Sequence, residues 1–149
     1  MKTSKKALAL ILVLVVLTGI AAYFHLSTRE EVIEGTVQVT VDGHAQTVKL
    51  ADLAYEPVSG VRVNGKGETI SVEGRGILVK DLLASTKIAS YSKVTVVSDD
   101  SYTADLTAEE VAESGKAYLL LEQPYLRLVV FGDQNSKRSV SNVVQIIVE

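Results

Sequence analysis

The pattern of hydrophobic and polar positions divides the chain into one long apolar stretch and a region of short alternating segments. Residues 7–24 (ALALILVLVVLTGIAAYF) are 18 consecutive positions without a charge, and Lys2, Lys5 and Lys6 precede them. A helix of this length extends about 27 Å, which is close to the hydrocarbon thickness of a bilayer. The pattern therefore predicts a transmembrane helix through residues 7–24, within an N-terminal segment of residues 1–28.

A cleaved signal peptide is the alternative to a retained membrane anchor. Signal peptides have apolar regions of about 7–15 residues, and the weak cleavage candidates here are Gly19/Ala21 and Ile20/Ala22. We favour the anchor, and the basic flank favours a cytoplasmic N-terminus. The sequence thus predicts a single-pass protein of the cell membrane whose residues 29–149 are extracytoplasmic, or secreted if the segment is cleaved.

Residues 29–149 show the period-two alternation of β-strands. Val37, Val39 and Val41 alternate with polar residues, and Asp42-Gly43 supplies a hairpin turn into residues 45–50. A second hairpin is predicted from residues 61–63 and 69–72 around Asn64-Gly65. Four further strands are predicted at residues 93–97, 118–121, 126–131 and 143–148, with a polar loop at residues 132–138.

Two short helices complete the predicted domain. Gly74 and Gly76 suggest a tight bend before residues 77–85, whose apolar positions fit one helical face. Thr107 and Glu110 have the spacing of a capping box, which predicts a helix over residues 108–114. We therefore expect an α+β fold, a strand-rich single domain of residues 29–149 preceded by one transmembrane helix.

Composition excludes several kinds of chemistry. The 149 residues include no cysteine and two histidines, so disulfides, thiolate nucleophiles and cysteine-ligated metals are impossible. Residues 1–28 hold three lysines and no acidic residue, so the remaining 121 residues carry a formal net charge of −6. A negatively charged domain argues against binding nucleic acid.

Most candidate motifs are better explained as ordinary turns. The segment GVRVNGK (60–66) begins like a phosphate-binding loop, but Gly67 stands where serine or threonine is needed, and a strand follows. His44 has no partner at metal-ligand spacing, and no G-x-S-x-G sequence occurs. A set of acidic residues could bind calcium or transfer protons, but their spacing lacks the order of a calcium-binding loop, which favours solvated turns. These residues are Asp99, Asp100, Asp105, Glu109 and Glu110. We predict no catalytic residue and no metal site.

An ordered string of segments resembles a known family. GILVKDLLA (76–84) resembles its G-x-x-L-x-x-L-L helix, and KVTVVSDDSYTADLTAEEV (93–111) resembles its strand, S-x-D-G-Y turn and following helix. YLLLEQPYLRLVVFGDQNSKRSVSNVVQIIV (118–148) resembles its C-terminal motif, and residues 37–53 resemble its opening. On these segments the chain resembles the oxidoreductase molybdopterin-binding domain, which has the sulfite-oxidase-like fold.

The departures from this family concern its chemistry. Its enzymes hold molybdenum through a cysteine thiolate, which this chain lacks, and the stretch between Leu53 and Gly76 is shortened. The family's V-K-W falls on residues 140–142, which here read VSN. Four residues match or adjoin the family's motifs and would be the contacts for a ligand in its cleft: Tyr102, Arg127, Lys137 and Arg138.

Three functions stay open at this point. The first is a non-catalytic relative of the family, tethered outside the cytosol, that binds a small ligand or an envelope protein and holds no cofactor. The second is a molybdopterin-binding redox protein, or an accessory subunit of a membrane-associated oxidoreductase, with the pterin phosphate on Arg127, Lys137 or Arg138. The third is a structural envelope domain. The missing cysteine and the missing catalytic set favour the first.

Overall fold

The computed structural model describes residues 4–27 and 33–149, which belong to two compact units, residues 1–32 and 33–149. The first unit contains helix α1 (Lys5–Ser27), which buries none of its residues. The helix is long and apolar enough to cross a membrane, and a signal sequence near an N-terminus has the same properties.

The second unit is built on a sheet of nine strands, counted over the described residues. The strands follow the order β2-β1-β9-β8-β7-β4-β3, and β5 pairs with both β9 and β6. Two short helices, α2 (Val79–Ser85) and α3 (Ala108–Ala112), and a 3-10 turn at Leu50–Asp52 lie between strands. The strands are β1 (Thr36–Val41), β2 (His44–Lys49), β3 (Glu56–Val63), β4 (Thr69–Leu78), β5 (Lys93–Ser98), β6 (Thr103–Thr107), β7 (Ala117–Glu122), β8 (Tyr125–Val130) and β9 (Val143–Val148).

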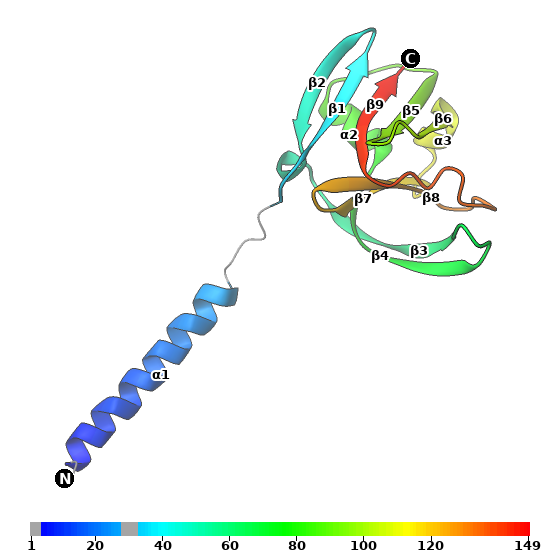
Figure 1. Ribbon diagram of the computed structural model, residues 1–149. Coiled ribbons are helices and arrows are strands. Elements are labelled where there is room, and N and C mark those ends of the chain that lie inside the picture. Colours follow the sequence, from blue (N-terminus) through cyan, green and yellow to red (C-terminus); the bar gives the residue numbers. More distant parts are fainter. Residues whose placement is uncertain (1–3, 28–32) are drawn as a thin grey trace. The chain divides into compact units, whose positions relative to one another are not determined.

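Strand β9 joins the two parts of the sheet. It runs parallel to β1, with Gln38 beside Gln145, and antiparallel to β5 on its other edge. Its first residue, Val143, pairs with Leu126 of β8. The sheet therefore divides at β9 into a part containing β2, β1, β5 and β6 and a part containing β8, β7, β4 and β3 (Figure 1).

The main core lies between these two parts and α2. The alternating residues that the sequence pattern places on one face, Val37 and Val39 of β1, are fully buried. Helix α2 contributes Val79, Leu82 and Leu83, which the helical spacing also placed on one face. The largest side chains in this core include Leu50, Leu106, Leu119, Leu126, Leu128 and Ile146.

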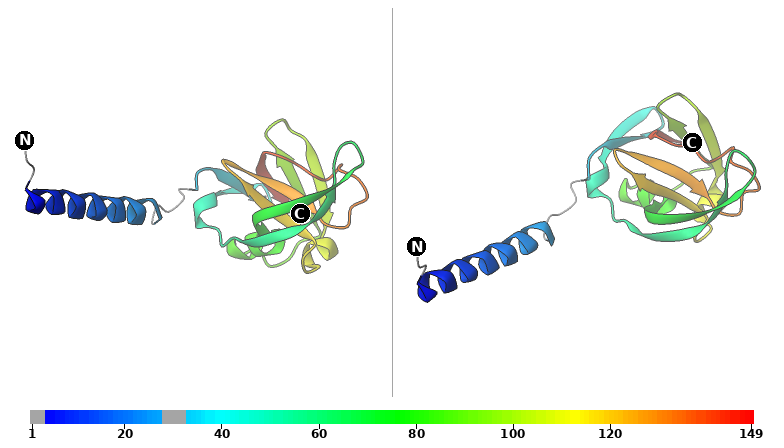
Figure 2. Two further views of the ribbon diagram at one scale, coloured as in Figure 1. Left: turned by 90° about the horizontal axis from the view of Figure 1, so that it is seen from below. Right: turned by 60° about the horizontal axis from the view of Figure 1, so that its bottom comes forward.

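A smaller apolar cluster lies between the β3–β4 hairpin and β7–β8. Val58 and Val72 of the hairpin are buried with Leu120 and Val129. Figure 2 shows the long curved hairpin beside β7 and β8. The ring of Phe131 packs edge-to-face on Tyr118, with ring centroids 5.7 Å apart, and adds to this cluster.

The structure confirms the strand-rich α+β organisation and corrects three local predictions. Residues Gly74 and Gly76 do not form a bend, because β4 continues through both of them to Leu78. The helix predicted from residue 77 begins at Val79, and the helix predicted over residues 108–114 ends at Ala112. Strand β6 was not predicted, because its residues alternate only briefly between the Asp99–Tyr102 turn and the helix cap at Thr107.

Gly76 keeps β4 close to β7. A Cβ at Gly76 would lie 2.8 Å from the backbone oxygen of Leu119, whereas a Cβ at Gly74 would meet nothing within 4 Å. We predict that Gly76→Ala lowers the free energy of unfolding by about 1–3 kcal/mol, because the backbone of a paired strand must shift. Gly74→Ala, two residues away, should change it by less than about 1 kcal/mol. Urea denaturation of both variants is the measurement, and equal effects would contradict this explanation.

Candidate functional site

The structure brings three of the four candidate ligand contacts into one region. Tyr102 lies in the turn between β5 and β6, and its hydroxyl donates a hydrogen bond of 2.6 Å to the backbone oxygen of Lys137. Lys137 and Arg138 lie in the polar loop that connects β8 to β9. Arg127 lies within β8 and shares no hydrogen bond or ion pair with these three in the described part of the chain.

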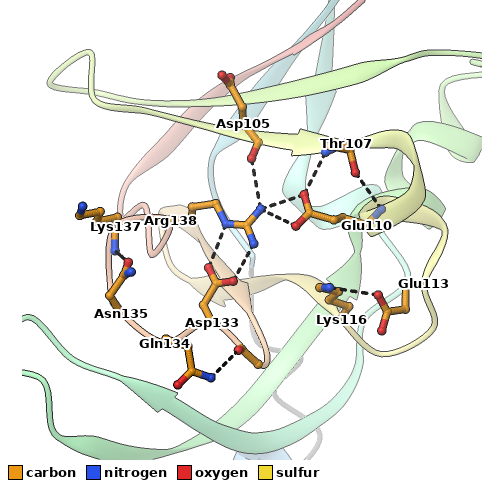
Figure 3. A network of polar contacts seen from close by, with 11 residues as sticks. Asp105, Thr107, Glu110, Glu113, Lys116, Asp133, Gln134, Asn135, Lys137 and Arg138 are labelled. Atoms are coloured by element: carbon orange, nitrogen blue, oxygen red, sulfur yellow. Dashed lines mark hydrogen bonds and ion pairs between the residues drawn. The ribbon is translucent and has the colours of Figure 1, made fainter.

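Arg138 is the centre of a network of polar contacts (Figure 3). Its Nε and Nη2 donate to the two carboxylate oxygens of Asp133, at 2.9 and 2.6 Å. Its Nη1 donates to both carboxylate oxygens of Glu110 at 2.8 Å, and weakly to the backbone oxygen of Asp105 at 3.4 Å. The guanidinium group is thus held by two carboxylates from two different segments.

The network connects the β8–β9 loop to the N-terminus of α3. Thr107 caps this helix by accepting a hydrogen bond from the backbone N–H of Glu110 at 3.2 Å. The Glu110 side chain in turn accepts from the backbone N–H of Thr107 at 3.0 Å, which completes the predicted capping box. Glu110 therefore serves the helix cap and Arg138 at the same time, so loop and helix are fixed together.

The charges of the network stabilise one another. The hydrogen bonds that Arg138 donates to the Asp133 carboxylate raise the pKa of Arg138 and outweigh the opposite effect of burial, with a further contribution from Glu110. Burial raises the pKa of Glu110, but the Thr107 N–H and the Arg138 guanidinium together outweigh burial and hold this pKa below its ordinary value. Both groups are therefore charged at neutral pH.

Arg127 is paired in a similar but more exposed way. Its Nε donates to Glu122 at 2.8 Å, and the side chains are 25% and 47% exposed. Arg127, Glu122, Arg62 and Glu73 line a small open groove of about 160 Å³ between the β3–β4 hairpin and β7–β8. The two arginines of this groove are balanced by two carboxylates.

The other candidate groups lie in exposed turns or edge strands. His44 begins the exposed edge strand β2. Asp100 accepts hydrogen bonds from the hydroxyl of Ser98 and the backbone N–H of Tyr102, and these lower its pKa. Within residues 4–27 and 33–149, no three His, Asp or Glu side chains are grouped so that they could hold a metal ion.

A second, larger groove was not predicted from the sequence. It has a volume of about 530 Å³ and lies where the starts of β1, β8 and β9 meet. Its lining comes from three segments far apart in the sequence, so no local motif could indicate it. The lining residues that carry polar or aromatic side chains are Thr36, Gln38, Tyr125 and Gln145.

Comparison with known proteins adds no relative: no family model and no curated protein sequence matches this chain.

We predict that Arg138 is more important for stability than Arg127. Arg138→Met leaves two carboxylates, which are only 21% and 23% exposed, without their cation. The free energy of unfolding should fall by about 2–3 kcal/mol. Arg127→Met is the matched control and should cost at most about 1 kcal/mol, because Glu122 is about half exposed. Similar losses in the two variants, measured by urea denaturation, would contradict the network's structural role.

Glu110 should make stability depend on pH in the acidic range. Because its pKa is lower in the folded state, its contribution is present above its unfolded pKa and is lost as the pH falls through the folded value. We therefore expect Glu110→Gln to be less stable than the parent at pH 7 and to lose less stability between pH 7 and pH 3. Glu109→Gln, at an exposed neighbouring position, should keep the parent's pH dependence. Denaturation series at several pH values test this, and parallel curves for the parent and Glu110→Gln would count against it.

Proposed function

We propose that this chain is a membrane-tethered, extracytoplasmic and non-catalytic relative of the molybdopterin-binding oxidoreductase domain that acts as a ligand- or protein-binding module. The apolar helix α1 supports the tether, with a secreted domain as the outcome if the segment is cleaved. The ordered segments between residues 37 and 148 support the relationship to the sulfite-oxidase-like fold. The function itself must be argued from the site, because fold and activity are separable.

The observation that carries the proposal is the internal pairing of the two candidate arginines. Arg138 is held by Asp133 and Glu110, and Arg127 is paired with Glu122. A pterin phosphate would have to compete with these carboxylates for the guanidinium groups. A molybdenum ion would also find no thiolate, the soft ligand that this family uses. Lys137 has no ion pair among the described residues, but a single lysine offers a phosphate no bidentate contact. The residues present therefore do not fit the family's cofactor.

A binding role accounts better than a redox role for the groove at the starts of β1, β8 and β9. The groove where the starts of β1, β8 and β9 meet offers about 530 Å³, which is within the usual range for sites of small molecules. Neither of the two histidines nor any carboxylate lines it, so it lacks the groups that usually transfer protons in catalysis. Its composition is suited to holding a ligand or a peptide without reacting with it.

The proposal predicts that the chain carries no molybdopterin. The full chain should be expressed in a host that synthesises molybdopterin, supplied with molybdate, and purified from membranes. Molybdenum is then measured by elemental analysis and pterin by fluorescence after acid release, with a known molybdopterin enzyme from the same host as the positive control. We expect neither to be present at more than a few percent of the protein. Stoichiometric pterin, with or without metal, would overturn the proposal and support a redox protein or accessory subunit.

A further inference from the structure

We infer that the groove between β1, β8 and β9 binds an uncharged, polyhydroxylated ligand, a short saccharide segment. This inference deepens the proposed binding function by naming the chemical class of the ligand. It depends on how the groove is built, on the hydrogen-bonding groups that it presents and on its lack of charge.

One end of the groove is built by a close backbone contact. Gly35 has a φ of +105°, and a Cβ at this position would lie 2.1 Å from the backbone oxygen of Pro124. The backbone oxygen of Gly35 also accepts a hydrogen bond of 3.1 Å from the N–H of Leu50, whose side chain is fully buried. The start of β1 is therefore fixed against the β7–β8 turn, and the groove is a formed part of the fold.

Two neighbouring glutamines supply the main hydrogen-bonding groups. Gln38 and Gln145 lie side by side in the parallel pairing of β1 with β9. The amide nitrogen of Gln145 donates to the hydroxyl of Thr40 at 3.0 Å, which orients its side chain. The side-chain amide of Gln38 has no hydrogen bond within the described residues. The side-chain amide oxygen of Gln145 accepts none there either. Each glutamine amide can donate and accept, as a sugar hydroxyl does.

The charge of the lining selects among ligand classes. Apart from the Tyr125 phenol, no ionisable side chain lines the groove, although residues 29–149 carry a net charge of −6. A bound ion would lose water without meeting an opposite charge, which is unfavourable. A saccharide needs only neutral donors and acceptors together with an apolar surface. Tyr125, which is half-buried, is the aromatic residue of the lining and supplies that surface.

An extended peptide is the main competing ligand, because peptide groups also pair with amides. Peptide strands bind by hydrogen-bonding to free backbone groups of a sheet edge. At this groove, however, β1 is paired with β2 on one edge and, from Gln38 onward, with β9 on the other. Only the stretch of residues 35–37 lacks a strand partner on the β9 side, and it is too short for a peptide strand to pair along, which favours the saccharide.

Saturation-transfer-difference NMR on the full chain in lipid nanodiscs tests this inference, since the method detects weak ligands of large particles. The probes are maltotriose, cellotriose and chitotriose, with N-acetyl-tetra-alanine amide as the neutral peptide. We expect saturation transfer to at least one trisaccharide, with millimolar or tighter affinity, and none to the peptide. Gln38→Ala and Gln145→Ala should each weaken binding about fivefold, as expected for one lost hydrogen bond.

Gln46→Ala is the matched control, because Gln46 is an exposed glutamine of β2 that does not line this groove. Its affinity should equal that of the parent, and circular dichroism should show that all three variants are folded. Absence of transfer to every saccharide, or equal binding by all variants, would overturn the inference. Transfer to the peptide alone would overturn it while leaving the proposed binding function in place. Stoichiometric pterin in the purified chain would instead overturn the proposed function itself.

Discussion

Strand β9 hydrogen-bonds with β1 on one edge and with β5 on the other, and its first residue pairs with β8. No other strand in residues 33–149 has three partners. Its inward residues Ile146 and Val148 belong to the main core, so the pairing also fixes how the two parts of the sheet enclose that core. Both the topology and the packing of the domain therefore depend on the pairing of β9 and on the burial of its inward residues.

The Arg138 network and the groove at the starts of β1, β8 and β9 differ in how their polar groups are used. In the β8–β9 loop, Arg138 is saturated by Asp133 and Glu110, so the charges serve to fix the loop. In the groove where the starts of β1, β8 and β9 meet, Gln145 and Gln38 keep much of their side-chain hydrogen-bonding capacity unused. Unused hydrogen-bonding groups on a formed surface are available to bind a ligand, whereas charges that are already paired within the protein stabilise its structure.

Local patterns predicted the elements of this fold better than its contacts. The alternation of valines located β1, and the Thr107–Glu110 spacing located the cap of α3, because both signals act within a few residues. The role of Gly76 depends on a carbonyl oxygen of β7, and the use of Arg138 depends on α3, so neither could be read locally. The groove was missed for the same reason, since its glutamines are 107 positions apart in the sequence and meet only through parallel pairing.

Native-state hydrogen exchange of the full chain at increasing urea concentration tests the central role of β9 most directly. We predict that the amides of Ile146 and Ile147 exchange only through global unfolding, with the same free energy as denaturation. The amides of the β3–β4 hairpin, which packs on the smaller cluster, should exchange through openings of lower free energy. Exchange of the β9 amides through a local opening, while those of β1 and β5 stay protected, would contradict the account.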